Sequence, residues 1–123
     1  MTRTLAALVI DDDEEVRAAI ADVLEQAGYY VVQASNGEAG LKLACEDILP
    51  DVILLDIAMP IMNGWQFMSA RLAWPDLIEV PVIILSGLQS AQRAAPHVGA
   101  VGLLRKPCSS DDLLRAVERA RAA

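Results

Sequence analysis

The chain has few residues that could cross-link it or attract an anionic polymer. Two cysteines among 123 residues are too few to hold together a secreted disulfide scaffold. The formal net charge of −7 argues against general binding to nucleic acid or to an anionic membrane. The sequence also lacks a long apolar run and a charged-then-apolar signal peptide. We therefore expect an acidic domain that resides in the cytoplasm.

Apolar side chains are abundant instead, at 54% of the sequence against 22% charged residues. This composition supports a packed core and disfavours disorder. The length is typical of one domain, and we find no repeat, low-complexity tract or linker. We therefore expect a single domain over residues 1–123. The alternative is that the chain is one domain cut from a longer regulator or hybrid kinase, against which Met1 argues mildly at the start.

Short apolar runs alternate with stretches of helical spacing. Runs in which nearly every position is apolar are typical of strands buried on both faces of a parallel sheet. Apolar residues at helical spacing between these runs predict the connecting helices. The expected strands are 5–10, 29–34, 52–55, 82–85 and 102–105, and the expected helices are 14–27, 38–45, 64–73, 91–98 and one that begins after Ser109 or Ser110. The pattern predicts an α/β fold with five strands and five helices.

Polar residues follow four of the five predicted strands. The strands end at Asp11-Asp12-Asp13, at Asp56, at Ser86 and at Lys106-Pro107. The carboxyl ends of parallel strands meet at one edge of a sheet, where such folds place their sites. Crowded carboxylates favour a divalent cation with oxygen ligands, and Mg²⁺ suits carboxylates, waters and a phosphate. A carboxylate can also be a nucleophile toward phosphorus, with a nearby lysine to offset the charge.

In their order and spacing these motifs resemble the response-regulator receiver domain of two-component signalling, in the form of a chemotaxis-regulator-like single domain. The resemblance covers essentially the whole chain. It implies a flavodoxin-like, doubly wound parallel sheet with strand order 2-1-3-4-5 and five flanking helices. The motifs are Val9-Ile10-Asp11-Asp12 with Arg17, Asp56 with Met59-Pro60 and Asn63-Gly64, Ile84-Leu85-Ser86-Gly87, and Lys106-Pro107.

The resemblance implies a role for each strand-end residue. Asp56 is expected to accept a phosphoryl group, and Ser86 and Lys106 to contact it. Mg²⁺ is expected to be held by Asp11, Asp12 and Asp56, with Asp12 as the better candidate for direct ligation and Asp11 acting through water. The family's further ligand is a backbone carbonyl two residues after the phosphoacceptor, which here belongs to Ala58.

The same resemblance implies protein partners. A histidine kinase or a phosphotransfer protein is expected to donate the phosphoryl group, and a downstream protein is expected to receive the signal by contact or by onward phosphotransfer. A homodimer formed on activation is also compatible with the family. The lysine-proline peptide bond after the fifth strand is commonly cis in this family, which a tight turn would accommodate.

Other chemically versatile residues have ordinary structural interpretations. Asp13 and the two glutamates after it suit the positive end of a helix dipole. We interpret His97 as a surface residue and Cys45 and Cys108 as small reduced hydrophobes. The aromatic residues between 65 and 74 are expected to pack on helices or cover helix ends.

The sequence departs from the family pattern at three places. The position three before Lys106 usually carries an aromatic ring coupled to the hydroxyl residue, and here it is Leu103, so the switch is altered. The segment from Ser86 to Gly99 is short and contains Pro96, which interrupts a helix. Ala58 and Leu88, each two residues beyond a site residue, cannot orient an attacking water, which predicts slow self-dephosphorylation.

Two alternative functions remain open at this stage. One is a degenerate receiver that acts only as a partner-binding module. The other is a phosphatase that uses Asp11 of the Asp-x-Asp sequence as its nucleophile, which would leave Asp56 unexplained. Apart from self-phosphorylation and self-dephosphorylation, we expect no enzymatic activity.

Overall fold

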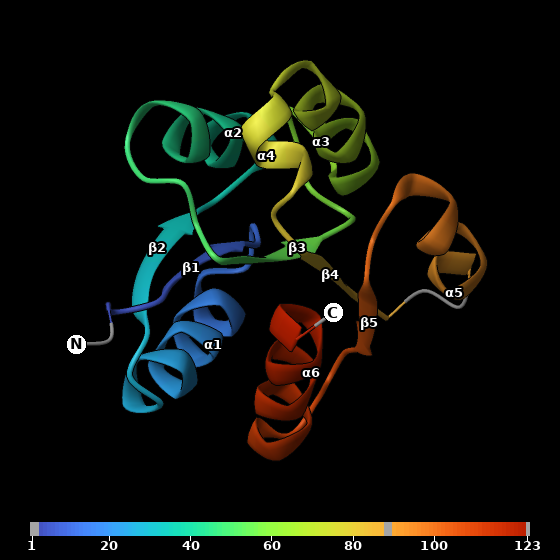
Figure 1. The fold of residues 1–123 in the computed structure, drawn as a ribbon. Helices are drawn as coiled ribbons and strands as arrows, with labels where there is room; N and C mark the ends of the chain where they lie inside the picture. The colour runs from blue at the N-terminus through green and yellow to red at the C-terminus, as the bar shows by residue number, and fades with distance from the viewer. Residues whose placement is uncertain (1–2, 88–89, 123) are drawn as a thin grey trace.

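The computed structural model describes residues 3–87 and 90–122. Five parallel strands form one sheet in the order β2-β1-β3-β4-β5, with helices on both faces (Figure 1). This confirms the doubly wound sheet that the sequence predicts. The strands are β1 (Ala6–Ile10), β2 (Tyr30–Ala34), β3 (Val52–Asp56), β4 (Val82–Ser86) and β5 (Gly102–Arg105).

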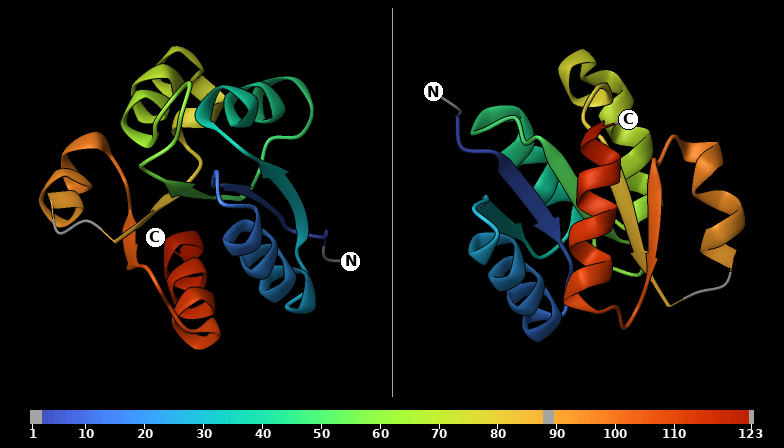
Figure 2. Two further views of the ribbon diagram at one scale, coloured as in Figure 1. Left: turned by 180° about the vertical axis from the view of Figure 1, so that it is seen from behind. Right: turned by 60° about the horizontal axis from the view of Figure 1, so that its bottom comes forward.

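Two layers of helices enclose the sheet. Helices α1 and α6 cover one face, and α2, α3 and α4 cover the other, as the views in Figures 1 and 2 agree. The helices are α1 (Glu14–Gln26), α2 (Gly37–Glu46), α3 (Gly64–Ala70), α4 (Pro75–Ile78), α5 (Ser90–Ala94) and α6 (Ser110–Ala122), with short 3-10 helices at Arg71–Ala73 and Pro96–Val98. Among the described residues, no helix is both long and apolar enough to cross a membrane.

The helical segments differ from the sequence prediction at two places. The helix expected over 64–73 stops at Ala70, and the additional helix α4 begins at Pro75. Trp74 has extended dihedrals, φ −122° and ψ 97°, because a residue before proline avoids the helical region, and Pro75 then starts a new helix at its first position. The segment expected over 91–98 divides at Pro96 into α5 and a 3-10 turn, because proline lacks the backbone N–H that a continuous helix needs.

Each central strand contributes to two separate cores. Successive side chains of a strand point to opposite faces. In β3, Ile53 and Leu55 therefore join the core beneath α2 and α3, whereas Val52 and Leu54 join the core beneath α1 and α6. All four are fully buried, and each such side chain contributes about 1.5–3 kcal/mol relative to an exposed position. The two cores hold β3, and hence its last residue, in place from both sides.

Side-chain caps define where the helices begin. Asp13 caps α1 by accepting hydrogen bonds from the backbone N–H groups of Glu15 and Val16, which confirms its structural interpretation. Ser109 caps α6 by accepting from the N–H of Asp112 at 3.1 Å. The other caps are Asn36 for α2 and Asn63 for α3.

Arg71 is a buried cation that sequence patterning did not reveal. Only 4% of its surface is exposed, and burial lowers the pKa of its guanidinium. It donates hydrogen bonds to the carbonyl oxygens of Ile78 (3.4 Å) and Val98 (3.3 Å), which end α4 and the second 3-10 helix. Its Nε has no hydrogen-bond partner among the described residues. Because helix C-termini carry partial negative charge, the guanidinium stabilises the two short helices together.

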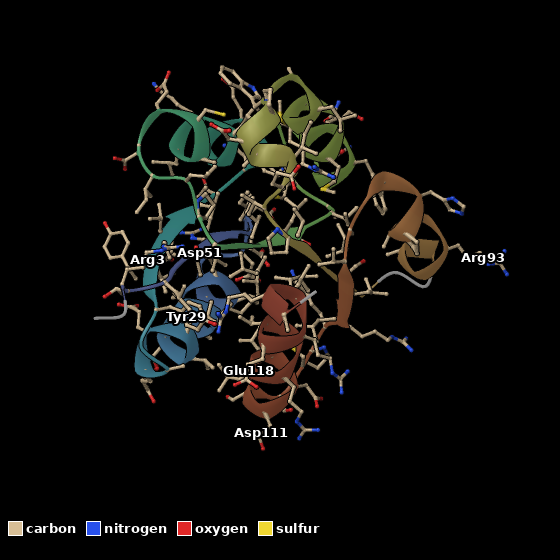
Figure 3. All side chains as sticks on the ribbon, in the orientation of Figure 1. Arg3, Tyr29, Asp51, Arg93, Asp111 and Glu118 are labelled. Atoms are coloured by element: carbon tan, nitrogen blue, oxygen red, sulfur yellow. The ribbon has the colours of Figure 1, made fainter. Side chains whose placement is uncertain are left out.

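A second arginine ties the start of the described chain to the sheet. Arg3 forms an ion pair with Asp51, and the two side chains lie beside each other in Figure 3. Asp51 also accepts a hydrogen bond from the backbone N–H of Ala6 at 2.7 Å. The hydrogen bond from Arg3 lowers the pKa of the Asp51 carboxyl. This pair fixes the first residues of β1 next to the approach to β3.

The connection from β3 to α3 needs a residue without a side chain at position 64. The backbone N–H of Gly64 donates to the carbonyl of Ile57 at 2.9 Å, and Asn63 and Gln66 cap the helix reciprocally. A Cβ atom at position 64 would lie 2.5 Å from the carbonyl oxygen of Asp56 and 2.9 Å from Cα of Ile57. Since both atoms belong to the backbone, the chain itself would have to move.

Replacement of Gly64 by alanine should therefore destabilise the fold. We expect Gly64→Ala to lower the free energy of unfolding by roughly 1–3 kcal/mol, as for other overpacked sites. Gly102→Ala is the matched control, because its Cβ would meet only side-chain atoms of Ile83, at 3.5 Å and beyond. This control should change the free energy by less than about 1 kcal/mol. Urea unfolding of the three proteins checks the expectation, and equal losses in both variants would contradict it.

Candidate functional site

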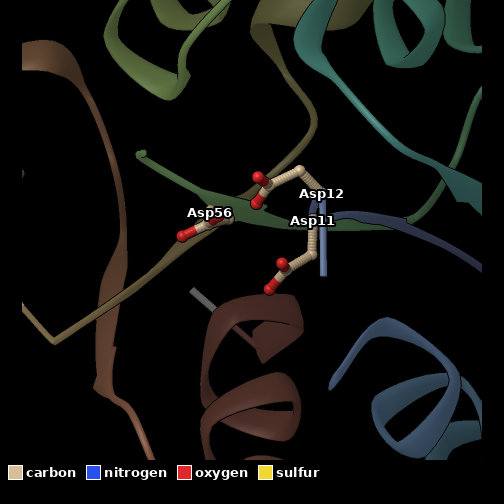
Figure 4. Close-up of side chains that lie close together, drawn as sticks. All are labelled: Asp11, Asp12 and Asp56. Carbon is tan, nitrogen blue, oxygen red and sulfur yellow. The ribbon is translucent and has the colours of Figure 1, made fainter. Parts of the chain in front are cut away.

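The carboxyl edge of the sheet gathers the polar residues that the sequence placed at strand ends. Asp11 and Asp12 follow β1, and Asp56 is the last residue of the neighbouring strand β3. One carboxylate oxygen from each of the three lies within 4.8 Å of the others. Figure 4 shows these carboxyl groups together at the ends of the two strands. The structure therefore brings together the acids that the sequence singled out.

Strand register explains this meeting point. Ile10 pairs with Leu55, so the residue after each of them lies at the same level of the sheet. Asp56 pairs with Leu85, and Ser86 pairs with Arg105, so Ser86 lies one residue beyond this level and Lys106 lies two residues beyond it, at the same edge of the sheet. The central strands β1, β3 and β4 are apolar and buried up to this level because helices cover both of their faces, and polar side chains follow where the strands end.

Asp11 is completely buried, and both of its carboxylate oxygens accept hydrogen bonds. Oδ1 accepts from the backbone N–H of Asp13 at 2.9 Å, and Oδ2 accepts from Nζ of Lys106 at 2.6 Å. Asp12, by contrast, is exposed. The two adjacent acids thus differ in kind, since one is fixed by the protein and the other faces solvent.

Lys106 is the cation of the cluster. Its Nζ lies 2.6 Å from Asp11 and 3.2 Å from Oδ1 of Asp56. Burial opposes the charged ammonium, but the hydrogen bond that Lys106 donates to Asp11 and the charges of both acids outweigh it and raise the pKa of Lys106. Its backbone N–H donates to the carbonyl of Ser86 at 3.1 Å, and the bond to Pro107 is cis. The lysine is therefore held by main chain as well as by side chain.

The surroundings of Asp56 disfavour its charged form. It is 6% exposed, and burial together with the charge of Asp11 raises the pKa of Asp56 to about 6. The charge of Lys106 acts in the opposite direction, and a hydrogen bond with Asp12 adds to the rise. A carboxyl group that desolvation keeps partly protonated near neutral pH is common at functional sites.

The remaining predicted site residues lie close to this cluster in the chain. Ser86 is buried at the end of β4, and Ala58 is exposed two residues beyond Asp56. Leu103 pairs with Ile84 and packs against the core beneath α2 and α3. Leu88 lies outside the described residues. His97 is exposed, which agrees with its interpretation as a surface residue.

Arg17 supports the site in a way that the motif alone did not indicate. Its guanidinium donates to the backbone carbonyl of Asp11 at 2.9 Å and to Oε1 of Gln33 at 3.2 Å. It thereby ties the turn after β1 to the edge strand β2. Only its spacing from the paired acids signalled its importance in the sequence, and the hydrogen-bond partner was not predictable from that spacing.

The charge balance of the cluster fits a divalent cation. Three carboxylates face one ammonium, so negative charge remains in excess within a partly buried space. Hard oxygen ligands of this kind are those that Mg²⁺ prefers, and an acidic triad at this edge is typical of a magnesium site. The donor set therefore fits the cofactor that the sequence led us to expect.

Comparisons with known proteins agree with this arrangement. The family model of the response regulator receiver domain matches residues 7–118. The chain is 38% identical over 125 residues to the protein-glutamate methylesterase/protein-glutamine glutaminase of Treponema pallidum, covering 96% of the chain and 30% of that protein. It is 31% identical to Protein Rrf1 of Nitratidesulfovibrio vulgaris, covering 94% of the chain and 81% of that protein.

A solved structure supports the same conclusion about the fold. The chemotaxis protein CheY4 of Vibrio cholerae superposes with a TM-score of 0.89 at 29% identity, over 96% of this chain and 99% of that one. Several curated relatives are much longer. The chain spans 30% to 49% of the length of the first four curated relatives that it matches.

The raised pKa of Asp56 predicts how the metal-free protein responds to pH. Both folded and unfolded chains carry a protonated Asp56 in strong acid. As the pH rises past 3.8 the unfolded chain ionises first, whereas the folded chain holds the proton up to about 6. Ionisation of Asp56 therefore lowers the free energy of unfolding across this window.

We expect Asp56→Asn to remove this loss. In the presence of a chelator, the variant should gain about 1–2 kcal/mol over the wild type at neutral pH, after allowance for solvent screening, and nothing near pH 4. Urea unfolding at a series of pH values measures the difference. Asp22→Asn on the exposed side of α1 is the control. A gain that is the same at every pH would contradict the expectation.

Proposed function

Because this chain belongs to the response regulator receiver domain family, whose members are phosphoacceptor switches of two-component signalling rather than enzymes, we propose that Asp56 accepts a phosphoryl group from a histidine kinase or a phosphotransfer protein. The observation that carries the proposal is the position of Lys106, whose Nζ lies within 3.2 Å of the carboxylate of Asp11, which follows β1, and of the carboxylate of Asp56 at the end of β3. An ammonium group in that place can bind an oxygen of an incoming phosphoryl group.

Three side chains of the site have distinct roles in the proposed phosphoryl transfer. A carboxylate oxygen of Asp56 forms a bond to phosphorus while the bond between phosphorus and the imidazole nitrogen of the donor's phosphohistidine breaks. The electron pair of that bond stays on the imidazole. Lys106 favours the ionised nucleophile and binds a phosphoryl oxygen, and the hydroxyl group of Ser86 binds another. Positioning and charge neutralisation are most of what phosphoryl transfer requires.

We assign the magnesium ligands to Asp12, Asp56 and the backbone carbonyl of Ala58, with Asp11 acting through water. The two acids of β1 support this division, because Asp11 already accepts two hydrogen bonds whereas Asp12 is exposed. When bound, Mg²⁺ neutralises charge on the phosphoryl oxygens. The protein contributes the acids, their spacing and the lysine whose ion pairs hold two of these acids close together in the metal-free state.

The signal is proposed to leave the site through the ends of β4 and β5. A phosphoryl group on Asp56 competes with Asp11 for the ammonium group of Lys106. The backbone N–H of Lys106 donates a hydrogen bond to the carbonyl of Ser86. A change in that balance shifts a two-state equilibrium in the loops after β3 and β4. Because Leu103 stands in place of an aromatic ring, side chains other than residue 103 would have to transmit the change. The proposed output of the switch is contact with another protein or onward phosphotransfer.

The setting of this switch is also part of the proposal. We propose that residues 1–123 act as a single receiver domain in the cytoplasm, where nucleotide-dependent kinases operate, and that activation is compatible with a homodimer. The alternative of a phosphatase with Asp11 as nucleophile is disfavoured, because that side chain is completely buried and both its oxygens are engaged.

Phosphorylation of the isolated protein tests the proposal directly. Incubation with acetyl phosphate and Mg²⁺ should add one phosphoryl group, as measured by the intact mass. The adduct should be absent from Asp56→Asn and from a wild-type sample treated with a chelator, because the nucleophile and charge neutralisation are both required. An adduct that forms on Asp56→Asn would relocate the phosphoacceptor. No adduct on the wild type, with Mg²⁺ binding confirmed by calorimetry, would favour a module that only binds partners.

The residue types at positions 58 and 88 also predict a long-lived phosphoryl group. Neither Ala58 nor Leu88 can position water for attack on the acyl phosphate. We expect Ala58→Asn combined with Leu88→Glu to shorten the lifetime of the adduct by roughly tenfold or more. This is a modest increase in the rate of hydrolysis for side chains that orient the attacking water. The decay of the phosphorylated mass over time measures this. An unchanged or longer lifetime in the double variant would count against the expectation.

A further inference from the structure

A small groove opens between the end of α2 and the start of α4, on the face of the sheet opposite α1 and α6. These two helices lie close together in Figure 1. The groove has a volume of about 190 Å³, and its floor and walls are mainly apolar. Its apolar lining residues are Ala44, Cys45, Leu49, Trp74, Pro75 and Leu77.

Exposed apolar side chains are frequent in the two chain segments that contribute to this groove. Of the eight large hydrophobic residues exposed in the described chain, five belong to segments 48–49 and 72–78, which supply part of the groove's lining. Leu49 and Trp74 line the groove and are each 48% exposed. Trp74 lies where the first 3-10 helix ends and α4 begins, in keeping with the expectation that it covers a helix end, yet about half of this residue stays exposed to solvent. A gathered set of this kind, unlike scattered single residues, marks an interaction site.

Acidic side chains form the rim of the groove. Glu46 and Asp47 end α2, and Asp76 lies in the first turn of α4. None of the three makes an ion pair within residues 3–87 and 90–122. Acids at a helix C-terminus oppose the helix dipole, and α2 has no basic residue in its last turn to offset them. Such a local cost without a compensating contact points to a positively charged partner.

The dimensions and charge of the groove exclude several occupants. Sites for drug-sized ligands measure about 300–1,000 Å³, so this one is too small for more than one side chain. The acidic rim repels a nucleic acid or an anionic membrane. A second copy of the chain also fits poorly, because its arginine-rich segment 93–121 exposes only Val101 as a large apolar side chain among the described residues.

We propose that this groove docks a segment of a partner protein in which one bulky apolar side chain is flanked by lysine or arginine. The apolar side chain enters between Leu49 and Trp74, and the basic residues pair with the rim. The lining residues precede β3 and β4 in the chain, so the groove lies toward the amino ends of these strands and away from Asp56. Docking here leaves the acidic cluster free and does not depend on its chemistry.

Selection from a displayed library of short random peptides tests this surface without a known partner. The wild-type protein, with no phosphodonor present, should select peptides that combine a bulky apolar residue with flanking lysine or arginine. Binding of one synthesised peptide is then followed by fluorescence in a Trp65→Phe background, where Trp74 is the remaining tryptophan. Its emission should shift to the blue as the ring leaves water.

Two pairs of variants locate the contact. Trp74→Ala should weaken peptide binding by roughly thirtyfold, as for a hot-spot residue, with calorimetry as the readout. Tyr30→Ala, which removes an exposed aromatic on β2, is its control and should have no effect. Asp47→Asn with Asp76→Asn should weaken binding about tenfold at low salt and flatten its salt dependence. Asp22→Asn with Glu25→Gln, exposed acids of α1, is the matched control.

Each outcome decides the proposal. Thermal unfolding monitored by circular dichroism tests whether each variant is folded. If Trp74→Ala does not fold, Leu49→Ser provides a second variant of the groove. Selected peptides without basic residues, equal binding by groove and control variants, or an unshifted Trp74 emission would each overturn it. Because no phosphodonor is used, failure here leaves the assignment of Asp56 unaffected, and failure to phosphorylate Asp56 leaves this surface unaffected.

Discussion

The ammonium group of Lys106 is the contact on which the functional edge of this protein depends. It lies 2.6 Å from a completely buried carboxylate on β1 and 3.2 Å from a second one on β3. Without a cation between them, two desolvated acids on adjacent strands would repel each other at the point where the strands end. The lysine thus permits a concentration of negative charge that the fold alone could not hold, and it does so only in part. Burial, together with the charge of Asp11, still raises the pKa of Asp56 to about 6.

The two edges of the sheet have opposite characters. At the carboxyl edge, polar groups converge and most of their hydrogen bonds are satisfied by the protein, as the two acceptors of Asp11 show. Toward the amino edge, between α2 and α4, a groove combines apolar side chains with acids that form no ion pair among the described residues. The cluster at the carboxyl edge suits a reaction that transfers charge, and the groove at the amino edge suits a stable contact with a partner protein. A receiver built in this way can be held by one protein while another acts on its aspartate.

Much of this structure could be predicted from the sequence because its strands are unusually clear. Runs such as Val52–Leu55 are apolar throughout, and the acid, hydroxyl and ammonium groups follow such runs at one edge of the sheet. The sequence could not show α4, because its restart depends on the extended conformation of Trp74 before a proline. It could not show the burial of Arg71 either, since that side chain is held by carbonyl groups distant in sequence. The exposure of Trp74 and the shifted pKa of Asp56 likewise arise from neighbours that only the tertiary structure supplies.

The division of β3 between two cores has a consequence for how such a protein can change over evolutionary time. Its residues face α2 and α3 on one side and α1 and α6 on the other, and the two sets of contacts share only the backbone. One helical layer can therefore accumulate substitutions and acquire new surfaces while the other layer still fixes the strand. The aspartate at its end would keep its place through those changes. The helical layers can thus provide new contacts for partners, while the end of β3 keeps the chemistry constant.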